Sequence, residues 1–191
     1  MTDLSWPAER KLAASRTISC TGYARGDGLW DVEAHLVDTR PVGVAHPKYG
    51  VAKPAGYPLH EMKMRITIDD DMLIHDAEAV TIHAPFDPCR VPPANFPEVK
   101  GLSLKKGWKT DLSEIMGGTK GCTHLFELLG VLATVAYQTV ASSDHWIAKV
   151  DKGEIMPFYI DSCYSYKGSG PLVESLYPDL YRPLKIILSN D

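Results

Sequence analysis

Hydrophobic and polar residues alternate through most of the first half of the chain, which is typical of strands with one buried face. Four such segments occur as two pairs: 16–25 with 29–40, and 59–68 with 72–84. The first pair flanks the letters GDG and the second flanks DDD, and both are good turn sequences. Gly26 and Gly28 can supply the positive φ that tight hairpins need. The pattern therefore predicts two β-hairpins.

The parity of the side chains indicates which face of each strand is buried. In the third segment one face consists of Met62, Met64, Ile66 and Ile68. His60 shares this parity, so we expect it to point inward at the end of the strand. In the second segment the apolar face consists of Trp30, Val32, Ala34 and Leu36, and the opposite face carries Asp31, Glu33 and His35.

The spacing becomes helical after the fourth segment. It predicts a short helix over 111–116, a long one from about Cys122 to Ser142, and another short one after Pro171. Hairpins followed by helices indicate an α+β fold, in which an antiparallel sheet packs against the long helix. We expect an N-terminal tail over residues 1–15 and a single domain over 16–191.

Composition narrows the class of protein. The chain has 191 residues, 45% of them hydrophobic, and a net charge of −4, which argues against a nucleic-acid partner. No uninterrupted apolar run reaches the roughly 18 residues of a membrane span, and the N-terminus lacks the apolar stretch of a signal peptide. We therefore predict a cytoplasmic protein with no membrane partner, whose four cysteines are thiols.

His60 is the best candidate for a general base. An inward imidazole at a strand end is suited to proton transfer near neutral pH. The alternative is a core histidine whose hydrogen bonds are satisfied.

The start of the long helix concentrates a second set of candidates, in the letters GGTKGCTHLFELLG. Cys122 lies where the helix dipole favours a thiolate or an anion. His124 is a candidate acid or base, and Glu127, one turn on, is expected to orient its ring. Gln138 returns to a similar azimuth on the helix. The alternatives are a partly exposed helix edge and a small buried cysteine.

The first hairpin carries a third set. Arg25 and Asp27 are candidates to bind or stabilise a substrate oxyanion, and Tyr23, Trp30 and Asp31 are candidates to bind substrate. The alternative is a turn held together by ion pairs. We expect this hairpin, the start of the third strand and the start of the long helix to meet around one hollow.

A metal site is a further possibility. Cys89, Cys122, His124 and Cys163 supply suitable ligand types, although none forms a C-x-x-C pair. Nucleotide-binding and serine-hydrolase motifs are absent from the sequence.

Several sequence blocks together resemble a bacterial family known as domain of unknown function 2889. They include GYARGDGLWDVEAHLVDTR, GYPLHEMKMRITID, APFDPC, GLSLKKGW, GGTKGCTHLFELL and DSCYSY, and they span about residues 16 to 180. The resemblance implies a link to the catabolism of aromatic or acyl-CoA compounds. It also implies similarity to small lyases that break carbon–carbon bonds in lignin-derived phenolics without a cofactor.

These features lead to one hypothesis and two alternatives. The hypothesis is a cofactor-independent lyase that uses acid–base chemistry on an aromatic, lignin-derived phenolic substrate, with cleavage that releases formaldehyde. The first alternative is a metal-dependent hydrolase or lyase that uses Cys122 and His124. The second is a non-catalytic ligand-binding accessory protein of a catabolic pathway. The apolar long helix also suggests a homodimer.

Overall fold

The computed structural model of the chain describes residue 4 and residues 8–43, 52–105 and 107–183. The chain divides into two compact units, over residues 1–140 and 141–191, and each is described by itself. Part of the Pro- and Gly-rich segment between the second and third predicted strands, residues 44–51, lies outside the described residues.

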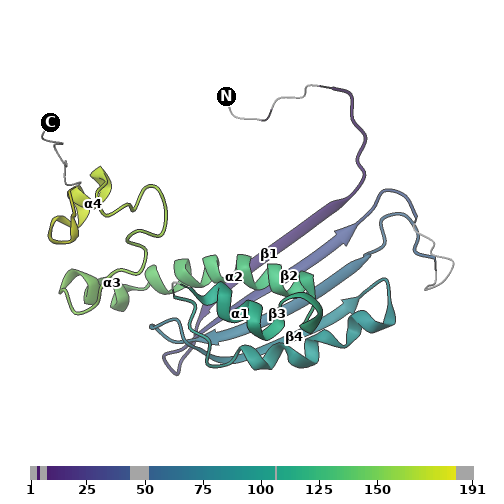
Figure 1. Cartoon of the computed structure of the whole chain (residues 1–191), viewed down its shortest axis with the longest axis horizontal. Coiled ribbons are helices and arrows are strands. Elements are labelled where there is room, and N and C mark those ends of the chain that lie inside the picture. The colour runs from purple at the N-terminus through teal and green to yellow at the C-terminus, as the bar shows by residue number, and fades with distance from the viewer. Residues whose placement is uncertain (1–3, 5–7, 44–51, 106, 184–191) are drawn as a thin grey trace, which may run out of the picture. The chain divides into compact units, whose positions relative to one another are not determined.

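The first unit contains one four-stranded antiparallel sheet (Figure 1). Its strands are β1 (Ser15–Ala24), β2 (Trp30–Thr39), β3 (His60–Ile68) and β4 (Ile74–His83), in that spatial order. Each strand lies within one or two residues of its predicted limits. The two predicted hairpins are joined edge to edge by pairing of β2 with β3.

The two hairpin turns use different residues to reverse the chain. Gly28 has a φ of 84°, as the glycine-rich turn predicts. In the second turn Met72 adopts the left-handed conformation with a φ of 64°. Asp69 supports that turn, because its Oδ1 accepts hydrogen bonds from the backbone N–H groups of Asp71 (2.9 Å) and Leu73 (3.0 Å).

Helical segments follow β4. These are η1 (Asp87–Arg90), η2 (Pro92–Val99), α1 (Trp108–Met116), η3 (Gly118–Lys120) and α2 (Thr123–Ala141). Helix α2 matches the predicted long helix, and α1 begins three residues before the predicted short one. In Figure 1 both α1 and α2 lie over one face of the sheet. The fold is therefore α+β, as predicted.

Helix α2 packs on the sheet through an apolar stripe. The buried stripe consists of Leu125, Leu128, Leu129, Leu132, Ala133, Ala136 and Val140. It faces the apolar rows that the parity predicts on β2 and β3. Val32 and Leu36 of β2 and Met62 and Ile66 of β3 are fully buried. Gly22 of β1 allows the helix to approach closely, since a Cβ atom there would overlap the side chain of Thr139.

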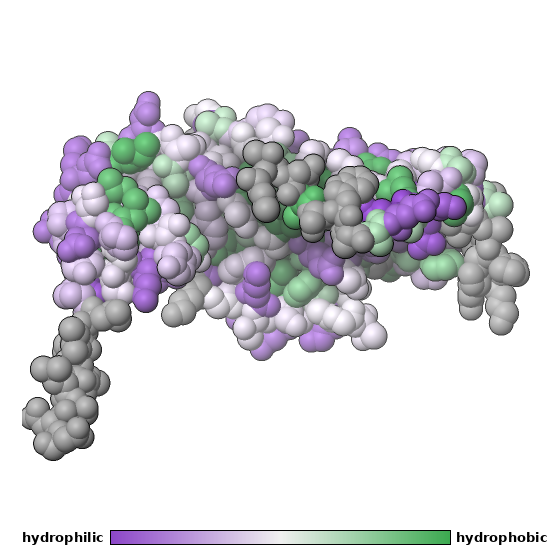
Figure 2. Space-filling model, turned by 90° about the horizontal axis from the view of Figure 1, so that it is seen from above, coloured by the Kyte–Doolittle hydropathy of each residue, from purple (hydrophilic) through white to green (hydrophobic). Residues whose placement is uncertain are grey.

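Helix α2 is also long and apolar enough to match a membrane span in length and composition. The core helix of a globular protein passes the same test, and the buried stripe gives α2 a partner within its own chain. Figure 2 shows hydrophobic residues scattered among hydrophilic ones on the face in view.

The second unit contains α3 (Asp144–Asp151), α4 (Pro171–Leu176) and η4 (Pro178–Leu180). The helix predicted after Pro171 is confirmed as α4, whereas α3 was not predicted. Aromatic rings gather in this unit: Trp146, with 2% of its surface exposed, lies 4.9 Å from Phe158 and 5.7 Å from Tyr159 between ring centroids. These aromatic side chains therefore pack against one another.

Candidate functional site

Three charged or polar residues lie side by side across three strands at one end of the sheet. Asp38 of β2 is paired in register with Arg16 of β1 and with His60 of β3. Directly opposed residues on neighbouring strands have their Cβ atoms about 5 Å apart and on the same face. All three have the parity of the buried apolar rows, so they extend the helix-covered face to its rim.

Helix α2 adds a fourth residue from the other layer. His124 is the second residue of the helix, and its ring centroid lies 4.0 Å from that of His60, with a tilt of 33° between the planes. The side chains of Asp38, His60 and His124 are 15%, 17% and 25% exposed. We call these three residues the Asp38–His60–His124 centre.

The carboxylate of Asp38 holds the centre together. Arg16 donates from Nε to Oδ1 over 2.7 Å and from Nη2 to Oδ2 over 2.8 Å, in a bidentate pair. Asp38 Oδ2 also lies 3.1 Å from His60 Nδ1 and 3.6 Å from His124 Nε2. The arginine fixes the carboxylate, and the carboxylate in turn orients the imidazole of His60.

The surroundings leave both imidazoles uncharged at neutral pH. Burial lowers the pKa of His60 below its ordinary value, and the nearby His124 lowers it further. Burial also lowers the pKa of His124, and the charge of Arg16 acts in the same direction. Hydrogen bonds from Arg16 lower the pKa of Asp38, which stays ionised. Nδ1 of His60 is then the donor to Asp38, and Nε2 keeps a free lone pair.

A cavity of about 310 Å³ opens beside the centre. Its wall includes Asp38, His60 and His124, together with Arg40, Thr39 and Leu59. Most of the lining residues are polar, and two of them are arginines, because Arg16 also contributes to the wall. The cavity is large enough for one substituted aromatic ring, and its arginines suit an anionic oxygen.

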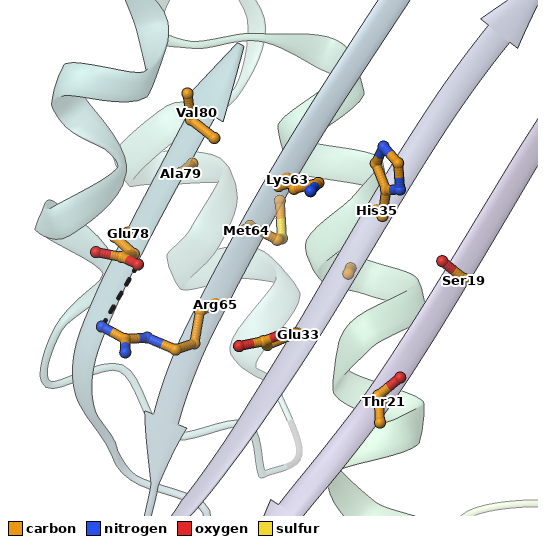
Figure 3. Close-up of a pocket in the computed structure, with 11 residues that line it drawn as sticks. Ser19, Thr21, Glu33, His35, Lys63, Met64, Arg65, Glu78, Ala79 and Val80 are labelled. Carbon is orange, nitrogen blue, oxygen red and sulfur yellow. Dashed lines mark ion pairs between the residues drawn. The ribbon is translucent and has the colours of Figure 1, made fainter. Parts of the chain in front are cut away.

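A larger hollow, of about 470 Å³, lies on the opposite face of the sheet. Figure 3 shows polar side chains from all four strands on this face, among them Lys63, Arg65 and Glu78. Arg65 lies 3.5 Å from Glu78 and 3.4 Å from Asp76, so its charge is balanced within the face. We interpret this hollow as the solvated side of a sheet that is covered on one face only.

The structure places the residues of the first hairpin away from the centre. Arg25 pairs with Asp27 over 2.6 Å and with Asp31 over 3.2 Å. Asp31 and Asp38 are seven residues apart along β2, about 23 Å at 3.3 Å per residue, and they project from opposite faces. The expectation of one shared hollow is therefore wrong for this hairpin, although His60 and His124 do meet.

Two other candidates of this hairpin have their own surroundings. Trp30 is only 8% exposed, and its Nε1 donates to Asp70 Oδ1 over 3.0 Å, so it belongs to the core on the helix side. Tyr23 is 48% exposed and pairs in register with Asp31 on the open face. Neither residue lines the cavity beside the centre.

Some of the candidates at the start of α2 and along it lie at the centre, and others do not. Cys122 directly precedes the helix, and its Sγ lies 3.8 Å from His124 Nδ1, so these two residues meet. Glu127 does not orient His124 as expected; it lies 3.3 Å from Arg16 Nη1 and is 58% exposed. Gln138 is exposed and 14 residues beyond His124, about 21 Å along the helix axis, so it does not reach the centre.

The four residues of the cysteine-rich metal set are spread over both units of the chain. Cys89 lies in η1 and Cys163 is an exposed thiol of the second unit. Among the described residues, the group of three whose donor atoms lie within 4.8 Å of one another is Asp38, His60 and His124. Only His124 is common to both sets.

Asp38 and Arg16 are the residues that sequence reasoning missed. The signal for Asp38 was the same as for His60, because the apolar row of β2 that starts at Trp30 and runs through Leu36 continues at Asp38. A carboxylate at a position with buried parity needs a partner. That partner is Arg16, which has the parity of Ile18 on β1.

The sequence was compared with known families, curated proteins and solved structures. The family described as protein of unknown function (DUF2889) matches residues 14–138. The chain belongs to this family. No curated protein and no solved structure gives a significant match. The matched residues contain all four strands and every residue of the Asp38–His60–His124 centre, whereas the second unit lies beyond them.

Proposed function

We propose that this member of the DUF2889 family is an enzyme that removes a proton from a small phenolic substrate at the Asp38–His60–His124 centre. One observation carries the proposal: a half-buried imidazole, His60, is held through Nδ1 by a carboxylate that is itself fixed by an arginine. This arrangement leaves His60 Nε2 as a neutral base at the wall of a cavity.

The reaction we propose is a carbon–carbon cleavage that releases formaldehyde. His60 Nε2 takes the proton of a substrate hydroxymethyl group. Before this step the substrate becomes a quinone methide: the phenol loses its proton, and its benzylic carbon expels an alkoxide or hydroxide, which leaves with that proton as an alcohol or water. The hydroxymethyl C–O bond then becomes a carbonyl as the adjacent C–C bond breaks, and the electron pair passes into the quinone methide, which becomes a phenolate. Atoms and charge balance without a redox partner, because the proton stays on His60 and the electrons stay on the ring.

Other residues of the cavity support this reaction. Arg40 lines the cavity and carries the positive charge that a phenolate oxygen needs. His124 lies within reach of Asp38 and is the second group able to give or take a proton. Phenolic substrate and lyase chemistry come from the resemblance to lignin-acting lyases. Cytoplasmic location and homodimerisation stay predictions of the sequence.

The experiment is a product assay with purified protein. Phenolic compounds that carry a hydroxymethyl side chain and a benzylic leaving group are incubated with the wild type, His60→Ala and a control, His75→Ala. His75 is a suitable control because it also pairs with a carboxylate, Asp69, over 2.8 Å, but it lies exposed at the start of β4 and outside the cavity. Formaldehyde and the aromatic product are measured.

We expect product from the wild type and His75→Ala and a large loss with His60→Ala. Equal product from His60→Ala would remove the base from the proposal. Saturable binding of these phenolics without any product would favour the ligand-binding accessory protein instead.

A further inference from the structure

The Asp38–His60–His124 centre has a donor set that is suited to more than proton transfer. It offers two imidazole nitrogens and one carboxylate oxygen, one from each of three elements: the end of β2, the start of β3 and the first turn of α2. Two histidines and one carboxylate that leave further positions open are a common ligand set for first-row transition metals.

The distances between donor atoms fit a single ion. Ligand atoms about 2.1 Å from a metal, at angles between 90° and 109°, lie about 3.0 to 3.4 Å from each other. Asp38 Oδ2 lies 3.1 Å from His60 Nδ1 and 3.6 Å from His124 Nε2. The whole set falls within 4.8 Å, so shifts of side chains alone would close the remaining gap.

The second layer of contacts also has the form that metal sites use. Arg16 donates to both carboxylate oxygens of Asp38, from Nε to Oδ1 and from Nη2 to Oδ2, and it fixes the carboxylate in the orientation in which Oδ2 also faces the two histidines. Cys122 Sγ lies 3.8 Å from His124 Nδ1 and accepts a hydrogen bond from its N–H when Nε2 is the ligand. Glu127, 3.3 Å from Arg16 Nη1, offsets the positive charge of the arginine beside the site.

We infer that Asp38, His60 and His124 bind one divalent first-row transition-metal ion, such as Zn²⁺, Co²⁺, Fe²⁺ or Mn²⁺. The cavity beside the centre leaves room for water or a substrate oxygen as the remaining ligands. The site differs from the cysteine-rich set suggested by the sequence, because it takes its carboxylate and one histidine from the sheet.

This inference rests on the proposed function in one respect: both place the reaction at the Asp38–His60–His124 centre. An ion on His60 Nδ1 takes the place of the Nδ1 proton, so the neutral ring then carries its proton on Nε2 and no longer has the lone pair that would accept the substrate proton. The base would then be a metal-bound water, while the substrate class and the cleaved bond stay the same. Metal binding and proton removal can therefore fail independently of each other.

The test is a binding experiment on the full chain after treatment with a chelator. Co²⁺ is titrated and followed by its visible absorption, and Zn²⁺ is titrated by calorimetry. We expect about one ion per chain in the wild type. Asp38→Asn, His60→Gln and His124→Gln should each weaken binding at least tenfold, and Cys122→Ala should weaken it by about 10- to 100-fold as a second-layer contact.

His75→Gln is the matched control. It removes an imidazole from another histidine–carboxylate pair, which has no third ligand within reach among the described residues. Its affinity should equal that of the wild type. Absence of binding to the wild type, or binding that is unchanged in all three ligand variants, would overturn the inference.

A second measurement needs no variant and so does not depend on mutant folding. Diethyl pyrocarbonate modifies accessible imidazoles, and mass spectrometry locates the modified residues. Zn²⁺ should protect His60 and His124 and leave His35 and His75 reactive. Equal reactivity of His60 with and without Zn²⁺ contradicts the site. Loss of turnover in His60→Ala without any metal binding would retain the acid–base proposal and reject the metal.

Discussion

The two ends of strand β2 carry similar groups in different settings. At one end Asp38 pairs with Arg16, and at the other Asp31 pairs with Arg25. Asp38 projects toward the helix layer, where α2 adds His124 and burial keeps the imidazoles neutral. Asp31 projects from the open face and accepts a hydrogen bond from Thr67 over 2.6 Å.

This comparison shows what an arginine–carboxylate pair needs in order to become part of a site. The pair alone stabilises a turn or a strand end and contributes about 0 to 1 kcal/mol when exposed. A second layer is required to bring a further reactive group to the same atoms and to limit access of water. Only the Asp38 end has that layer.

The largest expected difference between the two ends is in turnover. His60→Ala should lower the rate of product formation by about 10²- to 10⁴-fold, because it removes the base. Arg25→Gln should stay close to the wild-type rate, because Arg25 lies at the opposite end and face of the sheet. Formaldehyde release measures both. A large loss in Arg25→Gln would show that the ends are coupled.

The two aspartates give the next largest difference. Asp38→Asn should lower turnover at least about tenfold, since an amide no longer selects the Nδ1–H form of His60. Asp31→Asn should leave turnover unchanged and lower the melting temperature, since it weakens contacts to Arg25 and Thr67. Kinetics and thermal unfolding of both variants are compared. Similar turnover and similar melting temperatures in the two variants would contradict the difference proposed between the two ends of β2.

A third prediction concerns the approach of α2 to the sheet. Gly22→Ala places a Cβ atom against Thr139 and should lower the free energy of unfolding by about 1 to 3 kcal/mol. Adding Thr139→Ala should recover part of that loss. Gly26→Ala is the matched control, because nothing lies within 4 Å of a Cβ atom there. Urea unfolding of the four proteins measures the effect, and equal losses at both glycines would refute it.

The smallest expected effect is on the stability of the turn between β1 and β2, which contains Asp27. The hydrogen bond from Arg25 lowers the pKa of Asp27 below its ordinary value of 3.8. A carboxyl group with a lowered folded-state pKa stabilises the fold above its unfolded-state pKa, and this contribution disappears as the pH falls through the folded-state pKa. Asp27→Asn should therefore melt slightly below the wild type at pH 6 and together with it in strong acid. Because the pair is exposed, added salt should also reduce the difference.

Much of the fold could be predicted from the sequence because it depends on local periodicity. The alternation in β2 and β3 and the apolar stripe of α2 each identify an element and its buried face. Helix α3 was missed, since its eight residues bury only Trp146 and give a weak periodic signal. The segments η1 and η2 contain prolines within their own short sequences, and these prolines hid their helical turns.

The candidate site was predicted only in part, because it depends on contacts between distant segments. Parity identified His60, and an unusual helix start identified His124. No local pattern indicates that Arg16 would form an ion pair with Asp38, 22 residues away. Nor does any local pattern indicate that Glu127 would contact Arg16 rather than His124. The charges of the first hairpin pair with one another around a single turn, and their closeness in sequence does not bring them near His60.

The pairing of Asp38 with His60 across two strands has a consequence for evolution and engineering of this chain. A slip of one residue between β2 and β3 would turn one of these side chains to the other face and separate them. Insertions in the connection between the two strands are compatible with the site as long as they preserve that alignment. The rate at which His60 reacts would therefore show whether β2 and β3 are paired in the correct register. Circular dichroism gives the same signal for the correct register and for a shifted one.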